Sequence, residues 1–347
     1  MTTLDSPVES VEAVLRDTGR AVRRAMLDAI PDGEPHDWLY GPVRDYPMRA
    51  GKAIRPALCI AACCSFGGEQ SDALPLAVSI ELMHNAFLIH DDIADGSEQR
   101  RGKPTLPETA GTAIALNAGD ALAVVSQQVL RRHLRTLDRD LAERVHAEFD
   151  TMAMRTLEGQ ATELGWRRDH TGDLTPEDYL DLIMHKTCWY TTIHPLRVGA
   201  LIGARGDVDL RPMVRFGFHL GAAFQIQDDV LNLTGDEEQY GKEINGDLYE
   251  GKRTLPLIHL MANATGADRA TVDSYIAMDR EQRSADIVGA MRSMMDAYGS
   301  IDFTLEYARG IASEAYDAFD AAFASAAPSA HRDFVRDLIP YMLNRRG

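Results

Sequence analysis

Cysteine is scarce in this chain of 347 residues, and its distribution excludes a common class of metal site. The cysteines lie in apolar, helix-like stretches and are not spaced with histidines as zinc ligands are. Reduced, packed thiols of a cytosolic protein are the simpler interpretation, so zinc chemistry is not expected. The four are Cys59, Cys63, Cys64 and Cys188.

Basic residues are fewer than acidic residues in this sequence. Lys and Arg total 36 against 53 Asp and Glu, which gives a formal net charge of −17. A protein this acidic is not expected to bind nucleic acid or an anionic membrane through its overall field. Any anionic substrate must therefore be held by local groups of basic side chains or by a metal.

Long apolar runs and leader sequences are missing as well. No charge-free run reaches the roughly 18–20 residues that span a bilayer. The first ten residues, MTTLDSPVES, have neither the basic leader nor the apolar core of a signal peptide. We therefore predict a cytoplasmic protein without a transmembrane segment, whose residues 1–6 form a frayed acidic tail.

Strand patterns are absent too, and helical patterns fill the chain. No sustained period-two alternation, hairpin signal or nucleotide-binding glycine fingerprint occurs. Apolar residues recur at helical spacing over 7–30, 55–66, 80–89, 114–134, 141–164 and 212–233. The prediction is an all-α fold in one domain, 1–347, with long helices around a central apolar cavity and a surface loop over 234–253.

Two acidic motifs close apolar helices. Asp91 and Asp95, in Asp91-Asp92-Ile93-Ala94-Asp95, are four residues apart on one helical face, with Cβ atoms about 5–6 Å apart. Asp228-Asp229, followed by Asn232, repeats this spacing. A single acidic triplet is usually a solvated face. Two of them favour opposed Mg²⁺ sites across a cavity between helices.

The basic residues gather near these motifs, although a solvated surface would explain any one of them alone. Lys186 has mostly apolar neighbours, and His84 lies two helical turns before Asp91, where a core histidine is the alternative. No nucleophile with a neighbouring base stands out. Metal and phosphate-binding cations without a nucleophile fit a reaction in which diphosphate leaves. The other basic residues are Lys52 and Arg55 on one helical face, Arg100 and Arg101 after the first motif, and Lys242 and Lys252 after the second.

Seven motifs in order give the chain a family resemblance from Gly51 to Pro256. They are GKAIRP, ELMHN, DDIAD with GSEQRRGKPT, LNAGDAL, HKT, GAAFQIQDDVLN and GKEINGDLYEGKRTLP. The chain resembles the trans-isoprenyl diphosphate synthases (polyprenyl synthetases), which include farnesyl and geranylgeranyl diphosphate synthases. The resemblance implies the isoprenoid synthase fold, a homodimer, and head-to-tail condensation of isopentenyl diphosphate with allylic diphosphates.

The resemblance also implies a role for each motif residue. Asp91, Asp92, Asp95, Lys186, Asp228 and Asp229 would be catalytic. Three Mg²⁺ ions are implied, with Asp91, Asp95 and Asp228 as ligands and Asp92 in support. Isopentenyl diphosphate would be held by Lys52, Arg55, His84 and Arg101. The allylic diphosphate or its metals would be contacted by Arg100, Lys186, Thr187, Gln225, Lys242 and Lys252.

Two positions depart from the family pattern. Asn232 stands where many members have aspartate, and an amide oxygen is a weaker, uncharged ligand, so metal binding there is in doubt. Some synthases of twenty-carbon products share this asparagine. Pro107 stands near a position where many members have histidine, and nothing in the sequence explains it.

Product length depends on residues just before Asp91. An aromatic side chain there tends to block chain growth in this family. Ala86 leaves room, Phe87 either narrows the tunnel or packs against a neighbouring helix, and Met83 is flexible and need not close it. We expect a twenty-carbon product, geranylgeranyl diphosphate, with the fifteen-carbon farnesyl diphosphate as the alternative.

Two rival functions remain open. A class I terpene cyclase also uses an aspartate-rich helix and Mg²⁺, but Asn232 and Asp236 match its second motif poorly. A cyclase also has no need of an isopentenyl site. A non-catalytic subunit of a heteromeric synthase tends to lose an acidic motif, and this chain retains both.

Overall fold

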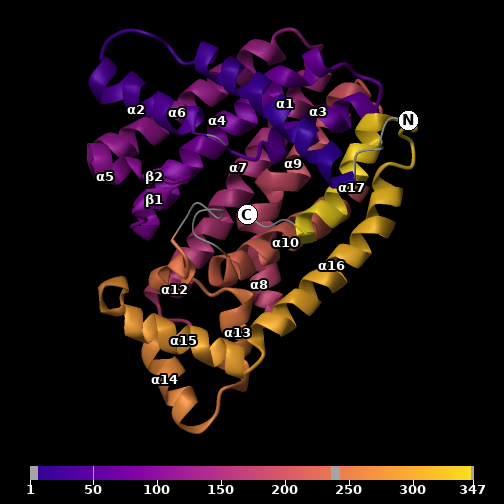
Figure 1. The fold of residues 1–347 in the computed structure, drawn as a ribbon. Helices are drawn as coiled ribbons and strands as arrows, with labels where there is room; N and C mark the ends of the chain where they lie inside the picture. Colours follow the sequence, from indigo (N-terminus) through magenta and orange to yellow (C-terminus); the bar gives the residue numbers. More distant parts are fainter. Residues whose placement is uncertain (1–6, 50, 236–242, 345–347) are drawn as a thin grey trace.

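The structure is a computed structural model that describes residues 7–49, 51–235 and 243–344 (Figure 1). Helices make up most of it, and within these ranges its only β-sheet is a hairpin of two antiparallel strands of two residues each. The helices are α1 (Pro7–Ala29), α2 (Gly41–Met48), α3 (Ile54–Ser65), α4 (Gln70–Asp95), α5 (Leu106–Ala110), α6 (Thr112–Leu134), α7 (Arg139–Arg168), α8 (Pro176–Ile183), α9 (His194–Gly203), α10 (Arg211–Thr234), α12 (Gly246–Glu250), α13 (Leu255–Asn263), α14 (Gly266–Ile276), α15 (Ala285–Ala297), α16 (Ser300–Ala322) and α17 (Ala330–Asn344). Two π-helical segments, η1 (His36–Tyr40) and η2 (Met184–Ile193), a 3₁₀ turn, η3 (Arg280–Gln282), and strands β1 (Gln99–Arg100) and β2 (Lys103–Pro104) complete it.

The all-α prediction is confirmed, and most predicted helices match the observed bounds to within a few residues. The surface loop expected over 234–253 is the exception. Its described part contains α12 and is partly buried, since Glu250 and Arg253 are 8% and 2% exposed. Arg253 is drawn inward because its guanidinium donates to the backbone oxygen of Thr171 at 3.0 Å. The predicted tail, 1–6, lies outside the described residues.

Helix α4 is the central helix of the first half of the chain. It begins with a capping box, in which the side chains of Glu69 and Asp72 satisfy each other's backbone N–H groups. It ends at Gly96, whose left-handed φ of 64° lets the chain turn away directly after Asp95. The cap therefore fixes the first acidic motif in the last turn of the helix.

Two helices, α4 and α6, are long and apolar enough on average to cross a membrane, by length and composition alone. The apolar window of α4 is 72% buried inside the protein, and that of α6 is 39% buried. The two pack against each other, and α4 also packs against α3. Both serve as core helices, although α6 keeps one face exposed.

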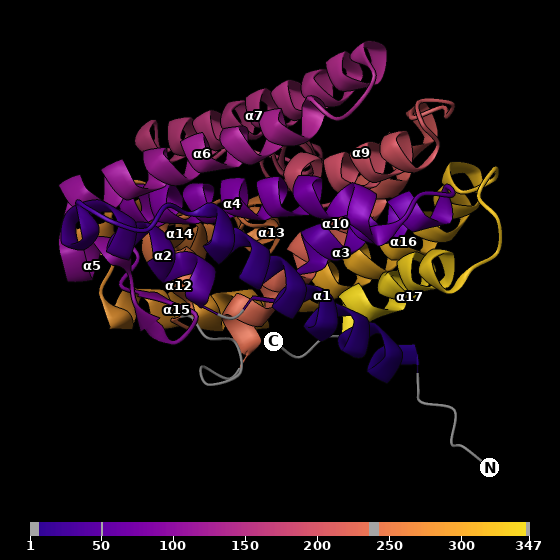
Figure 2. The same cartoon turned by 90° about the horizontal axis from the view of Figure 1, so that it is seen from above.

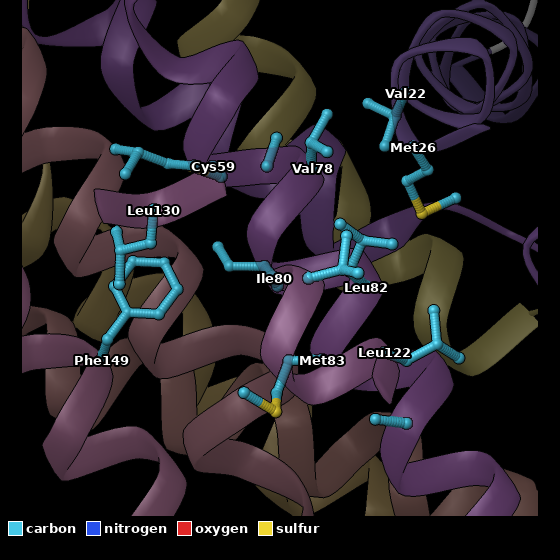
Figure 3. Packing of buried hydrophobic residues seen from close by; sticks show 14 of the residues in the cluster. Val22, Met26, Cys59, Val78, Ile80, Leu82, Met83, Leu122, Leu130 and Phe149 are labelled. Atoms are coloured by element: carbon cyan, nitrogen blue, oxygen red, sulfur yellow. The ribbon is translucent and has the colours of Figure 1, made fainter. Parts of the chain in front are cut away.

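The helices form layers around α4 and α10. Figure 2 shows α6 and α7 along one side of the molecule, α3, α4, α9 and α10 in the middle, and α1 and α17 on the opposite side. The long helix α16 packs along α10, and α9 packs along α3. Figure 3 shows the core between these layers, where Met83 of α4 lies among Leu122 of α6, Phe149 of α7 and their neighbours.

Close approach of α3 and α9 depends on glycine. A Cβ atom built on Gly199 would lie 2.2 Å from the backbone oxygen of Cys59. Gly203, one turn later, makes the same approach to the backbone oxygen of Cys63. Only glycine lets the two backbones meet at this distance, because real Cβ atoms do not approach oxygen so closely.

We predict that Gly199→Ala lowers the free energy of unfolding by about 1–3 kcal/mol, since the added methyl group forces α3 and α9 apart. The matched control is Gly289→Ala in α15, where a new Cβ meets no atom within 4 Å. That change should stabilise the helix by about 0.5–1 kcal/mol. Urea unfolding followed by circular dichroism measures both, and equal effects would contradict the prediction.

Candidate active site

A cavity of about 580 Å³ opens between α4, α10, η2 and the loops that follow the acidic motifs. Its wall contains both charged and apolar side chains. The charged lining is Lys52, Arg55, Glu81, His84, Asp91, Arg100, Arg101, Glu163, Lys186, Asp228, Asp229, Asp247, Lys252 and Arg253. The apolar and aromatic lining includes Ile54, Leu88, Leu182, Ile183, Tyr190 and Phe224.

The outer aspartates of the first motif differ in their surroundings. Asp91 lines the cavity with about a quarter of its side chain exposed. Asp95 is buried, and its carboxylate pairs with Arg167 at 2.6 Å and with Lys252 at 2.8 Å. Burial alone would raise the pKa of Asp95, but the charges of Lys252 and Lys186 outweigh it and hold that pKa below its ordinary value.

The middle aspartate, Asp92, is fully buried and turned away from the cavity. Its Oδ1 accepts a hydrogen bond from Arg100 Nε at 2.9 Å, and its Oδ2 accepts one from the Tyr46 hydroxyl. A buried carboxylate needs such partners, because an unpaired charge in the interior is strongly unfavourable. Asp92 therefore holds Arg100 at the cavity wall.

The arginines after the first motif sit on a tight hairpin. Gln99 and Arg100 of β1 pair with β2, and the turn between the strands is Arg101-Gly102, with left-handed φ values of 55° and 69°. Such a turn suits the twist of a two-residue hairpin. Arg49 anchors it by donating to the backbone oxygens of Arg100 at 3.0 Å and Pro104 at 2.8 Å.

Lys186 and Thr187 lie in the π-helical segment η2, which packs directly on α7. A Cβ atom on Gly159 of α7 would lie 2.2 Å from the Lys186 backbone nitrogen, so glycine is required there. The Lys186 ammonium contacts Glu163 of α7 and lies 3.7 Å from Asp91. Burial lowers the pKa of Lys186, but Asp91 and Glu163 raise it above the ordinary value, so the side chain stays charged.

The second acidic motif lies near the end of α10 and lines the same cavity as the first. Asp228 and Asp229 both line the cavity, but Asp229 is only 4% exposed and accepts hydrogen bonds from Tyr179 Oη at 2.7 Å and Gln225 Nε2 at 2.8 Å. Burial and then the nearby charge of Asp247 raise the pKa of Asp229 to about 8. The two aspartates of this pair are thus in different environments, as in the first motif.

Asn232 points to the loop that follows α10. Its Oδ1 accepts a hydrogen bond from the backbone N–H of Asp247 at 3.2 Å, and its backbone oxygen accepts one from Asn245 N at 2.8 Å. An amide at this position therefore anchors the segment that brings Asp247 to the cavity.

A second group of cations lies near the buried carboxylate of Glu81. Arg55 Nη1 is 3.3 Å from His84 Nε2, and its guanidinium lies over the Tyr190 ring, 4.3 Å from the centroid. Arg101 and Lys52 line the same cavity. The prediction that Lys52 and Arg55 share a helical face was wrong, because Ala53 has a left-handed φ of 55° and α3 begins only at Ile54.

The chain is similar to known proteins over most of its length. A family model described as "Polyprenyl synthetase" matches residues 36–294. The "Short chain isoprenyl diphosphate synthase" of Methanothermobacter thermautotrophicus is 32% identical over 262 residues, covering 76% of each chain. The geranylgeranyl pyrophosphate synthetase structure from Pyrococcus horikoshii has a TM-score of 0.84 at 29% identity, over 97% of this chain and 99% of that one.

The chain belongs to the polyprenyl synthetase family.

Its fold is the isoprenoid synthase fold, and its activity is that of a trans-prenyl diphosphate synthase, a prenyltransferase. A polyprenyl synthase from Caulobacter crescentus, complexed with calcium and isoprenyl diphosphate, aligns with a TM-score of 0.84 at 25% identity, over 98% of each chain. Names of other relatives range from geranylgeranyl to nonaprenyl diphosphate synthase, so membership in the family does not give the product length.

The structure brings most of the predicted synthase residues together around one cavity. Asp92 and Asp95 belong to the same cluster but are buried behind its wall. Lys242 lies outside the described residues. The three chain-length candidates do not line the described cavity: Met83 and Ala86 are packed in the core, and Phe87 is half-buried with its ring 5.9 Å from that of Tyr190.

The donor set fits the divalent metal on which this family depends. Among the described residues no group of three or more His, Cys, Asp or Glu side chains gathers around one point. Mg²⁺ does not need such a cage, because it binds through one or two carboxylates and keeps water and substrate phosphate as its other ligands. Asp91 and Asp228 offer hard carboxylate oxygens at the cavity wall, and Asp95 lies one helical turn from Asp91.

Several residues of the site were not predicted from the sequence. Glu163 and Arg167 follow Gly159 at four-residue steps along α7, and they continue its buried apolar face with charge. These two residues could therefore have been found from the sequence, because charge on an otherwise apolar helix face is unusual. Tyr46 and Tyr179 gave no signal, because each reaches an aspartate from a different helix, 46 and 50 residues away in the sequence.

Proposed function

We propose that the protein condenses isopentenyl diphosphate head-to-tail with an allylic diphosphate, in the presence of Mg²⁺, to give an all-trans prenyl diphosphate. The observation that supports this most directly is the presence of two cation groups on one cavity. One group lies among the carboxylates, around Lys186 and Lys252, and the other lies around Arg55 and Arg101. Two diphosphates can thus be held with their chains in the same cavity.

We assign the allylic diphosphate to the acidic end. Asp91, Asp95 and Asp228 would hold as many as three Mg²⁺ ions there, which neutralise the leaving diphosphate. Arg100, Lys186 and Lys252, with Thr187 and Gln225, would add hydrogen bonds and charge. The side chains that would hold isopentenyl diphosphate are Lys52, Arg55, His84 and Arg101.

The apolar side chains of the cavity would keep water away from the reacting carbons. Loss of diphosphate leaves an allylic cation, which water would quench, so the reacting carbons must lie in a dry pocket. Leu88, Tyr190 and Phe224 supply apolar surface next to the charged groups. The electron-rich face of the Tyr190 ring already accommodates the Arg55 cation. The double bond of isopentenyl diphosphate would then attack the allylic cation to form the new carbon–carbon bond. Loss of a proton from the resulting cation, with the released diphosphate as the acceptor, completes the condensation.

The rival functions are less well supported. A terpene cyclase has no use for the second cation group around Arg55 and Arg101. A non-catalytic subunit has no need to keep both acidic motifs in contact with one cavity, as Asp91 and Asp228 are.

A single domain acting in the cytoplasm agrees with the enzyme's membership in a family of soluble synthases.

For product length we propose twenty carbons, geranylgeranyl diphosphate, with farnesyl diphosphate as the alternative. Ala86 is small, so no bulky side chain stands one turn before the first motif, although Ala86 itself packs in the core and off the described cavity. Phe87 is held edge-on against Tyr190, with ring planes at 81°, and this contact directs the ring toward η2. The half-buried Phe87 ring is thereby kept against a neighbouring helix.

We also propose a homodimer in which α6 and α7 of two copies meet. These helices form an outer layer (Figure 2) and expose several large apolar side chains, which cost free energy in water. Those more than a third exposed are Leu116, Val124, Met154, Leu157 and Leu164.

Purified protein with Mg²⁺, isopentenyl diphosphate and dimethylallyl, geranyl or farnesyl diphosphate should yield longer prenyl diphosphates. Chromatography of the dephosphorylated products measures their length, and chelation of the metal should abolish turnover. A cyclic hydrocarbon formed from an allylic diphosphate alone would favour the cyclase. Absence of turnover with every primer would favour the non-catalytic subunit.

Ala86→Phe should shorten the product to fifteen carbons or fewer, because the new ring occupies space one turn before Asp91. Ala86→Leu, a smaller enlargement, should shift only part of the product. The same chromatography reads both variants, and thermal unfolding confirms that they fold. Product of unchanged length from folded variants would show that position 86 does not form the floor.

Leu157→Glu should dissociate the dimer, because it places a charge in the proposed interface. Sedimentation should give twice the chain mass for the wild type and a lower mass for this variant. The matched control is Tyr316→Glu on α16, where an exposed aromatic side chain lies outside the proposed interface. A monomeric wild type, or a variant that stays dimeric, would exclude this interface.

A further inference from the structure

The two acidic motifs share an arrangement that their sequences do not reveal. In each, the second aspartate of the pair is buried and accepts a hydrogen bond from a buried tyrosine hydroxyl of another helix. Tyr46 of α2 donates to Asp92 Oδ2, and Tyr179 of α8 donates to Asp229 Oδ2 at 2.7 Å. The exposed fractions of the two tyrosines are 0% and 2%.

The other carboxylate oxygen of each aspartate holds a side chain of the cavity wall. Asp92 Oδ1 accepts from Arg100 Nε at 2.9 Å. Asp229 Oδ1 accepts from Gln225 Nε2 at 2.8 Å, and Gln225 Oε1 in turn accepts from Thr187 Oγ1 at 3.1 Å. Each aspartate is therefore a bridge from a tyrosine of another helix to a polar group that faces the cavity; Tyr179 itself also lines the cavity, whereas Tyr46 does not.

The bridge constrains orientation as well as charge. A carboxylate can rotate about its last bond, and a donor on only one oxygen leaves that rotation weakly restricted. A second donor on the opposite oxygen fixes the plane of the group, and with it the side chain bound to the first oxygen. Tyr46 is itself fixed, because its hydroxyl also accepts the backbone N–H of Leu106 at 3.3 Å, and the guanidinium of Arg49 covers its ring.

We propose that Tyr46 and Tyr179 are positioning residues of the diphosphate site, which orient Arg100 and Gln225 through Asp92 and Asp229. Neither tyrosine hydroxyl needs to touch substrate for this role. The inference rests on the proposed allylic diphosphate site and adds the residues that orient its wall.

The test removes one hydroxyl at a time. Tyr46→Phe and Tyr179→Phe should each raise KM for the allylic diphosphate and lower kcat/KM on the order of tenfold, because a buried hydrogen bond to the aspartate that orients a wall side chain is lost. The matched control is Tyr298→Phe, which removes a tyrosine–aspartate bond of 2.8 Å to Asp268 far from the cavity lining. It should leave KM and kcat unchanged.

A double-variant cycle separates positioning from general loss of stability. In the Asp92→Asn background, Tyr46→Phe should cost much less than it does in the wild type, because the tyrosine acts through that carboxylate. Calorimetric binding of inorganic diphosphate, with and without Mg²⁺, gives the same comparison without turnover, and melting temperatures show whether each variant folds.

The outcomes are distinct. The inference is overturned if the two tyrosine variants have the same KM and kcat as Tyr298→Phe in an active enzyme. It is also overturned if the losses in kcat/KM from Tyr46→Phe and Asp92→Asn multiply in the double variant. Either result leaves the proposed function intact. A wild type that neither turns over nor binds diphosphate would instead overturn the proposed function.

Discussion

The pairing of Asp95 with Lys252 and Arg167 is the interaction on which the charged end of the cavity depends. It joins three separate parts of the chain: the end of α4, the end of α7 and the loop after α12. Buried ions are stable only when they are paired, so each partner fixes the others in place. Glu250 also contacts Lys252 and accepts a hydrogen bond from Ser97 Oγ at 3.1 Å, which ties this loop back to the end of α4.

Helix geometry explains why the functional groups meet at one end of the molecule. Both acidic motifs lie in the last turns of long helices, where the helix dipole disfavours negative charge. The protein offsets this with cations from elsewhere, such as Lys186 from the π-helical segment η2. That segment reaches the cluster because Gly159 allows α7 to approach its backbone closely. Close packing and electrostatics therefore support the same arrangement, as a diphosphate site with divalent metal requires.

In each acidic motif, the two neighbouring aspartates have different roles. Asp91 and Asp228 line the cavity, whereas the more deeply buried Asp92 and Asp229 hold Arg100 and Gln225 of its wall. The same residue type thus serves two purposes one position apart, since adjacent side chains on a helix point about 100° apart. Asn232 shows a third use, because its amide anchors the loop that carries Asp247.

The sequence by itself determined the helical fold, the two acidic motifs and most of the residues around the cavity. These follow from local properties, namely the helical period of apolar residues and the spacing of charges along one helix. It did not determine that Asp95 would be paired with Arg167, that a tyrosine would reach each buried aspartate, or that Met83 and Ala86 would lie in the core and off the described cavity. Those contacts join residues far apart in the chain. Only the packing of helices against one another decides them, because a linear pattern specifies which face of a helix is apolar but not which side chain of another helix it meets.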